Sequence, residues 1–111
     1  MQATELLVEA RERVASGWSQ AEDARGAAGE AVEPWSADAR AWSLLGAIVA
    51  AFEDGRMEED GRVRLNELAT ALAALAQEIE DPSLATWNDH EHRTQNEVLG
   101  VLELAIAHLA V

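Results

Sequence analysis

The chain has 111 residues, no cysteine and a formal net charge of −13. This is long enough for one domain that folds alone, so we expect a single domain over residues 1–111 without disulfide or thiolate chemistry. We expect no direct binding to nucleic acid or to anionic membranes, because both need a cationic surface and 21 acidic residues outnumber the 8 arginines.

The apolar residues are mainly helix formers, with 23 alanines and 13 leucines and no tyrosine. This composition predicts a mainly α domain, a compact bundle of four principal helices. The longest apolar run, residues 44–52, is too short to span a bilayer. The first fourteen residues carry three glutamates rather than a basic, apolar signal, so a cytoplasmic location is expected.

The first helix is predicted over Thr4–Ser16. Thr4 can cap it and Gly17 can end it. Helical spacing predicts an inner face made of Leu7, Ala10 and Val14. Trp18 should fold back onto that face.

Residues 19–35 interrupt the helical pattern, with Gly26, Gly29 and Pro34 among small and charged residues. One interpretation is a short helix begun by Ser19 in a capping box with Glu22. The other, slightly favoured, is a short irregular or β-hairpin insertion between the first two helices.

The second helix is expected to begin at Ser36 and to run to about Glu53. It is apolar on almost all sides, which is typical of a central helix. Its main stripe is Trp42, Leu45, Val49 and Phe52. Ser43 would lie on this helix, and with no histidine near it in sequence it is not a candidate nucleophile.

Residues 56–67 partly match a calcium-binding loop, with Gly61 at its turn position and Glu67 at its twelfth position. Arg56 occupies the first position, where the ion needs an oxygen ligand, so no calcium site is predicted. A third helix should follow and end before Pro82, on the stripe Leu65, Leu68, Leu72, Leu75 and Ile79. This Leu65–Ile79 stripe is expected to pack within the domain, although homo-oligomerisation through it is possible.

The fourth helix begins with a capping box, in which Thr94 is the N-cap and Glu97 reaches back to it. Its inner face is predicted to contain Val98, Leu102, Ala105 and Leu109.

The turn before this helix, Trp87 to Arg93, concentrates polar groups behind a large aromatic side chain. Asp89 and Arg93 are close enough in sequence to pair, and Asn88 can bond free backbone groups. The favoured interpretation is a structural lock on the helix entry. The alternative is a ligand site facing the Trp42 end of the second helix, with the candidate residues Trp87, Asn88, Asp89, His90, Arg93 and Trp42.

His90 and His92 lie in the same turn, but a metal site needs three or four converging ligands. The only other histidine, His108, lies far along the last helix. We therefore predict no metal site and no cofactor, and the sequence contains no phosphate loop or dinucleotide-binding motif.

The chain resembles a family of small uncharacterised proteins from bacteria and their phages, the DUF6197 type. The resemblance rests on Gly17-Trp18, on residues 42–47 (WSLLGA) and 84–89 (LATWND), and on Arg93-Thr94 with residues 97–99 (EVL). Members often carry cysteine at the position of Ser43, which puts any thiol role in doubt here. The resemblance implies a helical fold and no established activity.

With no catalytic motif and a strongly acidic composition, the leading functional hypothesis is a non-catalytic protein–protein interaction module for a basic protein partner. The alternative is a small-ligand-binding or weakly hydrolytic protein with its site at the Trp87–Arg93 turn.

Overall fold

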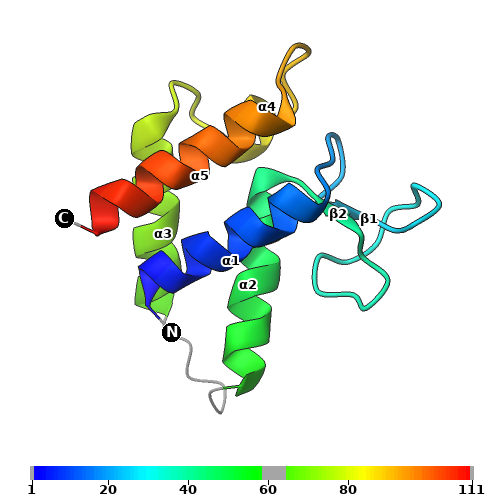
Figure 1. Cartoon of the computed structure of the whole chain (residues 1–111), viewed down its shortest axis with the longest axis horizontal. Coiled ribbons are helices and arrows are strands. Elements are labelled where there is room, and N and C mark those ends of the chain that lie inside the picture. The colour runs from blue at the N-terminus through cyan, green and yellow to red at the C-terminus, as the bar shows by residue number, and fades with distance from the viewer. Residues whose placement is uncertain (1, 59–64, 111) are drawn as a thin grey trace.

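A computed structural model describes residues 2–58 and 65–110 of the chain, and only the backbone of residues 56–58. These residues form a mainly helical domain with one two-stranded sheet (Figure 1). In chain order the elements are α1 (Ala3–Ser16), β1 (Ala24–Arg25), β2 (Ala41–Trp42), α2 (Leu44–Glu58), α3 (Leu65–Glu78), α4 (Leu84–Asn88) and α5 (Gln95–Leu109).

The four long helices confirm the four predicted principal helices. In Figure 1, α1 and α5 run side by side, α3 crosses both of them, and α2 crosses α1. The core lies between these helices, and alanines at the crossings let their backbones approach closely. Its largest fully buried apolar side chains are Leu6, Leu7, Val14, Leu44, Ile48, Leu75, Val98 and Leu102.

Helix α1 begins one residue before the predicted start and ends where predicted. Its predicted inner face is fully buried. The N-cap is Gln2 rather than Thr4, and the Gln2 backbone N–H lies 3.4 Å from the Glu5 carboxylate. A second carboxylate comes from α3, because Glu67 accepts a hydrogen bond from the Ala3 backbone N–H at 2.9 Å.

The insertion between α1 and α2 contains a small antiparallel sheet, so its hairpin interpretation is confirmed only in part. The chain does turn back after Arg25, which forms a bridge with Ala31. The partner strand of β1, however, is β2, with Ala24 opposite Trp42. Strand β2 therefore lies outside the predicted insertion, residues 19–35.

The predicted start of the second helix at Ser36 is wrong. Ser36 caps only a local turn, in which its hydroxyl accepts from the Asp38 N–H at 3.0 Å. Helix α2 begins at Leu44, and its N-cap is Ser43, whose hydroxyl accepts from the Gly46 N–H at 3.0 Å. Residues 41–42 cannot be helical because their backbone pairs with β1.

Helix α3 follows its prediction closely, and its stripe packs inside the domain. Leu75 and Ile79 are core residues, and Leu68 and Leu72 pack against the core while half-buried. Leu65 is 73% exposed. Homo-oligomerisation through this stripe therefore stays a prediction. Of the five stripe residues, Leu65 is the one whose side chain is largely exposed to a second copy.

Helix α5 confirms the fourth predicted helix. The short helix α4 before it was not predicted, and it places Trp87 and Asn88 in a helical turn capped by Ser83.

The centre of the calcium-loop-like stretch, residues 59–64, lies outside the described residues. No helix in the described ranges combines the length and the apolar character that crossing a membrane requires.

Candidate functional site

Asn88 lies at the centre of the predicted site and is completely buried. Its Oδ1 accepts hydrogen bonds from the Trp18 indole N–H at 2.8 Å and from the Leu44 backbone N–H at 3.0 Å. Its Nδ2 donates to the Ser19 carbonyl and to the Asp89 carboxylate, both at 3.0 Å. One amide thus joins α4 to the chain after α1 and to the first turn of α2.

The neighbouring groups of the turn hold the segment after α1. The Asp89 carboxylate accepts from the Ala21 backbone N–H at 2.9 Å. Gln20 Nε2 donates to the carbonyls of Asn88 and His90, at 3.1 and 3.0 Å. Ala21 has a φ of 71°, a conformation unusual for alanine that these bonds help to maintain.

Arg93 closes the other side of the turn. Its guanidinium carbon lies 3.8 Å from the centre of the Trp87 ring. Its Nε donates to the Trp87 carbonyl at 2.9 Å, and its Nη1 pairs with Glu97 at 3.1 Å. The expected pair between Asp89 and Arg93 is wrong, since each group has other partners and no such ion pair occurs in residues 2–58 and 65–110.

Trp42 is the one predicted site residue whose ring is directed elsewhere. Its indole N–H donates to the Pro34 carbonyl at 2.8 Å, and the side chain packs against the hydrophobic core. The residue is also among those that line a hollow beside α1. Only its backbone approaches the turn region, where its carbonyl accepts from the Ser19 N–H at 3.1 Å. The structure therefore brings together the five candidates from Trp87 to Arg93 and separates the Trp42 ring from them.

The residues that complete this cluster, Trp18 to Ala21, were not predicted as part of it. No local pattern in the sequence could predict these contacts, because the bonds to Asn88 and Asp89 join residues about seventy positions apart. A cavity of about 80 Å³ adjoins the cluster, lined by Ala21, Glu22, Asp23, Ser43, Ala85 and Asp89. Ligand sites for small molecules usually measure several hundred Å³.

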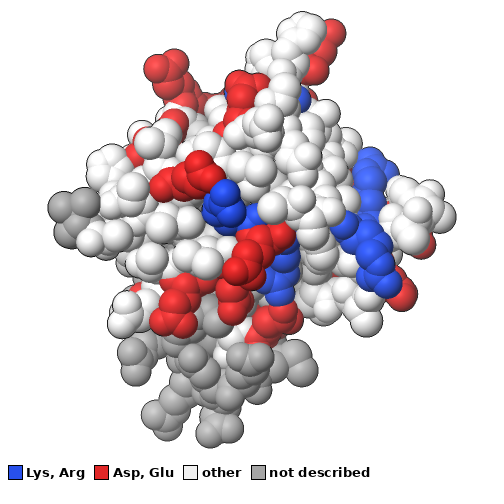
Figure 2. Space-filling view, viewed as in Figure 1, with Lys and Arg blue, Asp and Glu red and all other residues white. Residues whose placement is uncertain are grey.

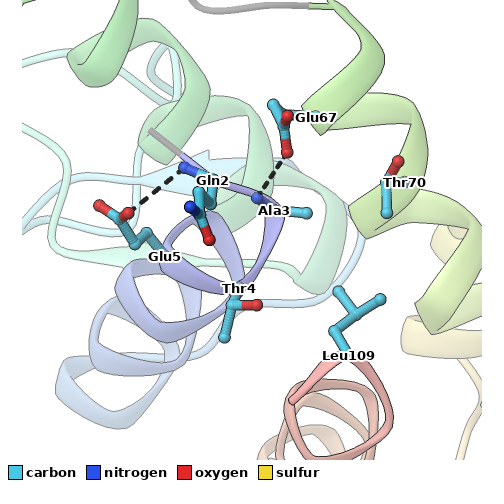
Figure 3. Close-up of a pocket in the computed structure, with 7 residues that line it drawn as sticks. All are labelled: Gln2, Ala3, Thr4, Glu5, Glu67, Thr70 and Leu109. Atoms are coloured by element: carbon cyan, nitrogen blue, oxygen red, sulfur yellow. Dashed lines mark hydrogen bonds between the residues drawn. The ribbon is translucent and has the colours of Figure 1, made fainter. Parts of the chain in front are cut away.

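A larger open hollow, of about 610 Å³, lies at the opposite end of α1 (Figure 3). It is lined by Gln2, Ala3, Thr4, Glu5, Glu67, Thr70 and Leu109, none of them a predicted site residue. Figure 3 shows the Glu67 carboxylate bonded to the first N–H of the helix. Because a carboxylate already occupies this positive helix end, the hollow is poorly suited to an anionic ligand.

The described ranges contain no group of three or more histidine, aspartate and glutamate side chains that could hold a metal ion. His90 and His92 are exposed in the turn. His108 contacts Glu78 on α3 through its Nδ1 at 2.5 Å.

The capping box of α5 gives a pH prediction. The Thr94 backbone N–H is the main cause that lowers the pKa of the Glu97 carboxyl; burial opposes it, while the Thr94 hydroxyl and Arg93 add to the lowering. Because the folded-state pKa is the lower one, this carboxylate stabilises the fold above its unfolded pKa, and the contribution is lost as pH falls through the folded pKa. We expect an NMR titration of Glu97 to have a lower midpoint in the folded chain than in urea. Equal midpoints would contradict this assignment.

Comparison with known proteins adds a family and no activity. A family model described as a family of unknown function, DUF6197, matches residues 1–108. Neither a curated protein nor a solved structure matches the chain.

Proposed function

We propose that this chain, which belongs to the DUF6197 family of unknown function, is a non-catalytic protein–protein interaction module that binds a basic partner through its acidic surface. The observation that carries the proposal is that the described arginine side chains already bond within the chain. The side chains of five arginines are described, those of Arg11, Arg13, Arg25, Arg40 and Arg93. Each of these guanidinium groups bonds to a carboxylate or a backbone carbonyl of the chain itself.

Two of these arginines join helices. Arg11 on α1 pairs with Glu103 on α5, and Arg13 pairs with Asp54 on α2. The others hold backbone turns: Arg25 bonds the Gly29 carbonyl, Arg40 bonds two carbonyls just before it, and Arg93 bonds the Trp87 carbonyl.

The acidic side chains are more numerous than the basic ones, and most of those described are exposed to solvent. Figure 2 shows carboxylates distributed over the visible face, with fewer basic groups between them. Exposed acidic residues in the described ranges include Glu5, Glu12, Glu22, Asp23, Glu30, Glu33, Asp38, Glu80, Asp89 and Glu91. A surface of this kind attracts a basic protein over a distance, and the attraction weakens as salt screens it.

The test is retention of proteins from a lysate on the immobilised chain, with a salt gradient and identification of what elutes. An unrelated helical protein of the same net charge serves as the matched control, because it reproduces simple ion exchange. We expect at least one basic protein to be retained by this chain and released by salt, and not to be retained by the control. Identical sets of proteins on both supports would contradict the proposal.

The alternative function, ligand binding or weak hydrolysis at the Trp87–Arg93 turn, stays a prediction with less support. Asn88, Asp89 and Arg93 already bond to protein groups, and the adjoining cavity is small. Small molecules can be screened by NMR for changes in the chemical shifts of His90 and Trp87. A compound that shifts the signals of both residues would favour this alternative.

A further inference from the structure

Helix α5 is apolar on all sides along most of its length. From Val98 to Ala107 the only charged residue is Glu103, and every other residue of that stretch is apolar. A helix of this composition is normally covered by other elements on all sides. Figure 1 shows α5 beside α1 in the layer nearest the viewer, with α3 behind it. In the part of the chain that the structure describes, the outer side of this apolar helix is therefore left uncovered.

The uncovered side of α5 presents a protruding leucine and a gap one helical turn apart. The Leu104 residue is 57% exposed. Gly100 precedes it by four residues, so both lie on the same face, and a Cβ atom at Gly100 would meet nothing within 4 Å. Asn96 and Ala107 are exposed and extend this surface at helical spacing. These four residues are here called the α5 outer face.

The charged groups that border the α5 outer face are already paired within the chain. Glu103 bonds to Arg11 on α1, Glu97 bonds to Arg93, and His108 contacts a glutamate of α3. A chain with a net charge of −13 repels a second copy of itself, and this repulsion is weakest where the local charges are balanced. The same balance makes the face unsuited to a basic protein, which needs unpaired carboxylates.

We infer that the α5 outer face is the contact surface between two copies of this chain, related by a twofold axis. When two α5 helices pack antiparallel about an axis level with Leu102, Leu104 of each copy lies opposite Gly100 of the partner subunit. The leucine then fills the space that the glycine leaves, and it does so twice by symmetry. One surface thus supplies both the projection and the gap, which is the self-complementarity that a twofold interface requires.

The size of the α5 outer face predicts a weak dimer. Helix α5 has 15 residues, so at 1.5 Å per residue the contact is about 22 Å long, and it is about 10 Å wide for one helix. Stable interfaces cover about 800 Å² on each partner, which is considerably more. The dimer is therefore expected to form at high protein concentration and to separate on dilution.

The experiment is sedimentation equilibrium of the full chain at protein concentrations up to about 1 mM. We expect a monomer–dimer equilibrium that Leu104→Ala weakens by about tenfold or more, because the projection is lost from both copies. The matched control is Leu65→Ala, the same change at an exposed leucine on α3, and it is expected to weaken the dimer less than twofold. Weakening by Leu65→Ala and not by Leu104→Ala would place the contact on α3 and overturn the inference.

Two further variants test the twofold pairing itself. Gly100→Leu fills the gap and is expected to weaken the dimer by about tenfold or more. Leucine is a better helix former than glycine, so this loss cannot come from a less stable helix. Combining Gly100→Leu with Leu104→Ala exchanges the projection and the gap, and dimerisation is expected to return to within about threefold of the wild type. A double variant as weak as the single ones would show that the two positions do not face each other.

Salt distinguishes this dimer from the proposed basic partner. Screening reduces the repulsion between two acidic copies, so the dimer is expected to tighten as salt rises, whereas retention of a basic protein weakens. A dimer that weakens with salt would overturn the α5 contact, because it would depend on unpaired charges. A wild type that remains monomeric at about 1 mM in high salt would overturn it as well. Neither result bears on the proposed function, which the retention experiment decides separately.

Discussion

Replacing Asn88 by alanine is expected to lower the free energy of unfolding by about 3 to 5 kcal/mol. The substitution removes four hydrogen bonds in a fully buried position. It leaves the Trp18 indole N–H, the Leu44 backbone N–H and the Ser19 carbonyl without their partner, and unpaired buried polar groups are costly. Since domains of this size are stable by about 5 to 15 kcal/mol, this is a large share of the total.

The measurement is urea unfolding followed by circular dichroism. Thr86→Ala is the matched control, because Thr86 is an exposed residue of the same short helix. Its effect is expected to stay below about 0.5 kcal/mol. If Asn88→Ala costs no more than this control, the amide does not hold α4, the first turn of α2 and the segment after α1 together.

Replacing Gly46 by alanine is expected to destabilise the fold by about 3 kcal/mol. A Cβ atom at this position would lie 1.9 Å from the Asp23 carbonyl oxygen, which is backbone and cannot rotate away. The same carbonyl accepts the Ser43 N–H at 3.0 Å, so moving it also disturbs the cap of α2. The absence of a side chain at Gly46 therefore lets the insertion pack directly on the helix.

Gly100→Ala is the matched control for this second variant. Gly100 also lies inside a helix, but a Cβ atom there meets nothing within 4 Å. Because alanine is the better helix former, this change is expected to stabilise the fold by about 0.5 to 1 kcal/mol. Opposite signs for the two glycines in urea unfolding would confirm the packing, and a stable Gly46→Ala variant would show that the Asp23 backbone can yield.

A third glycine, Gly17, also permits a close backbone approach. Gly17 ends α1, and a Cβ atom there would lie 2.2 Å from the Arg40 carbonyl oxygen. The same close approach brings β2, and with it Trp42, against the end of α1. Trp42 is one of the residues that line the hollow beside α1.

Several elements could be predicted because their determinants are local. Thr94 and Glu97 lie three residues apart, and their reciprocal bonds form in α5 as the capping-box pattern predicts. The inner face of α1 and the core residues of α3 follow from helical spacing, since burying one face requires apolar residues three or four apart.

Other features depend on partners that are distant in sequence. Residues 41–42 have apolar spacing that fits a helix, but pairing with β1 makes them a strand, and the cap moves from Ser36 to Ser43. Helix α4 was missed because it is five residues long and too short for periodicity to reveal.

The amino-acid sequence by itself determined the mainly α class, the four long helices, the acidic charge and the polar turn before α5, because composition and local spacing decide these properties. Only the tertiary structure decided what Asn88 bonds to, where α2 begins and which surface Trp42 lines. Those outcomes depend on contacts between residues 44 to 70 positions apart for Asn88, or on a backbone approach that only a glycine permits. No local pattern encodes contacts of this kind, since they form only when the helices pack.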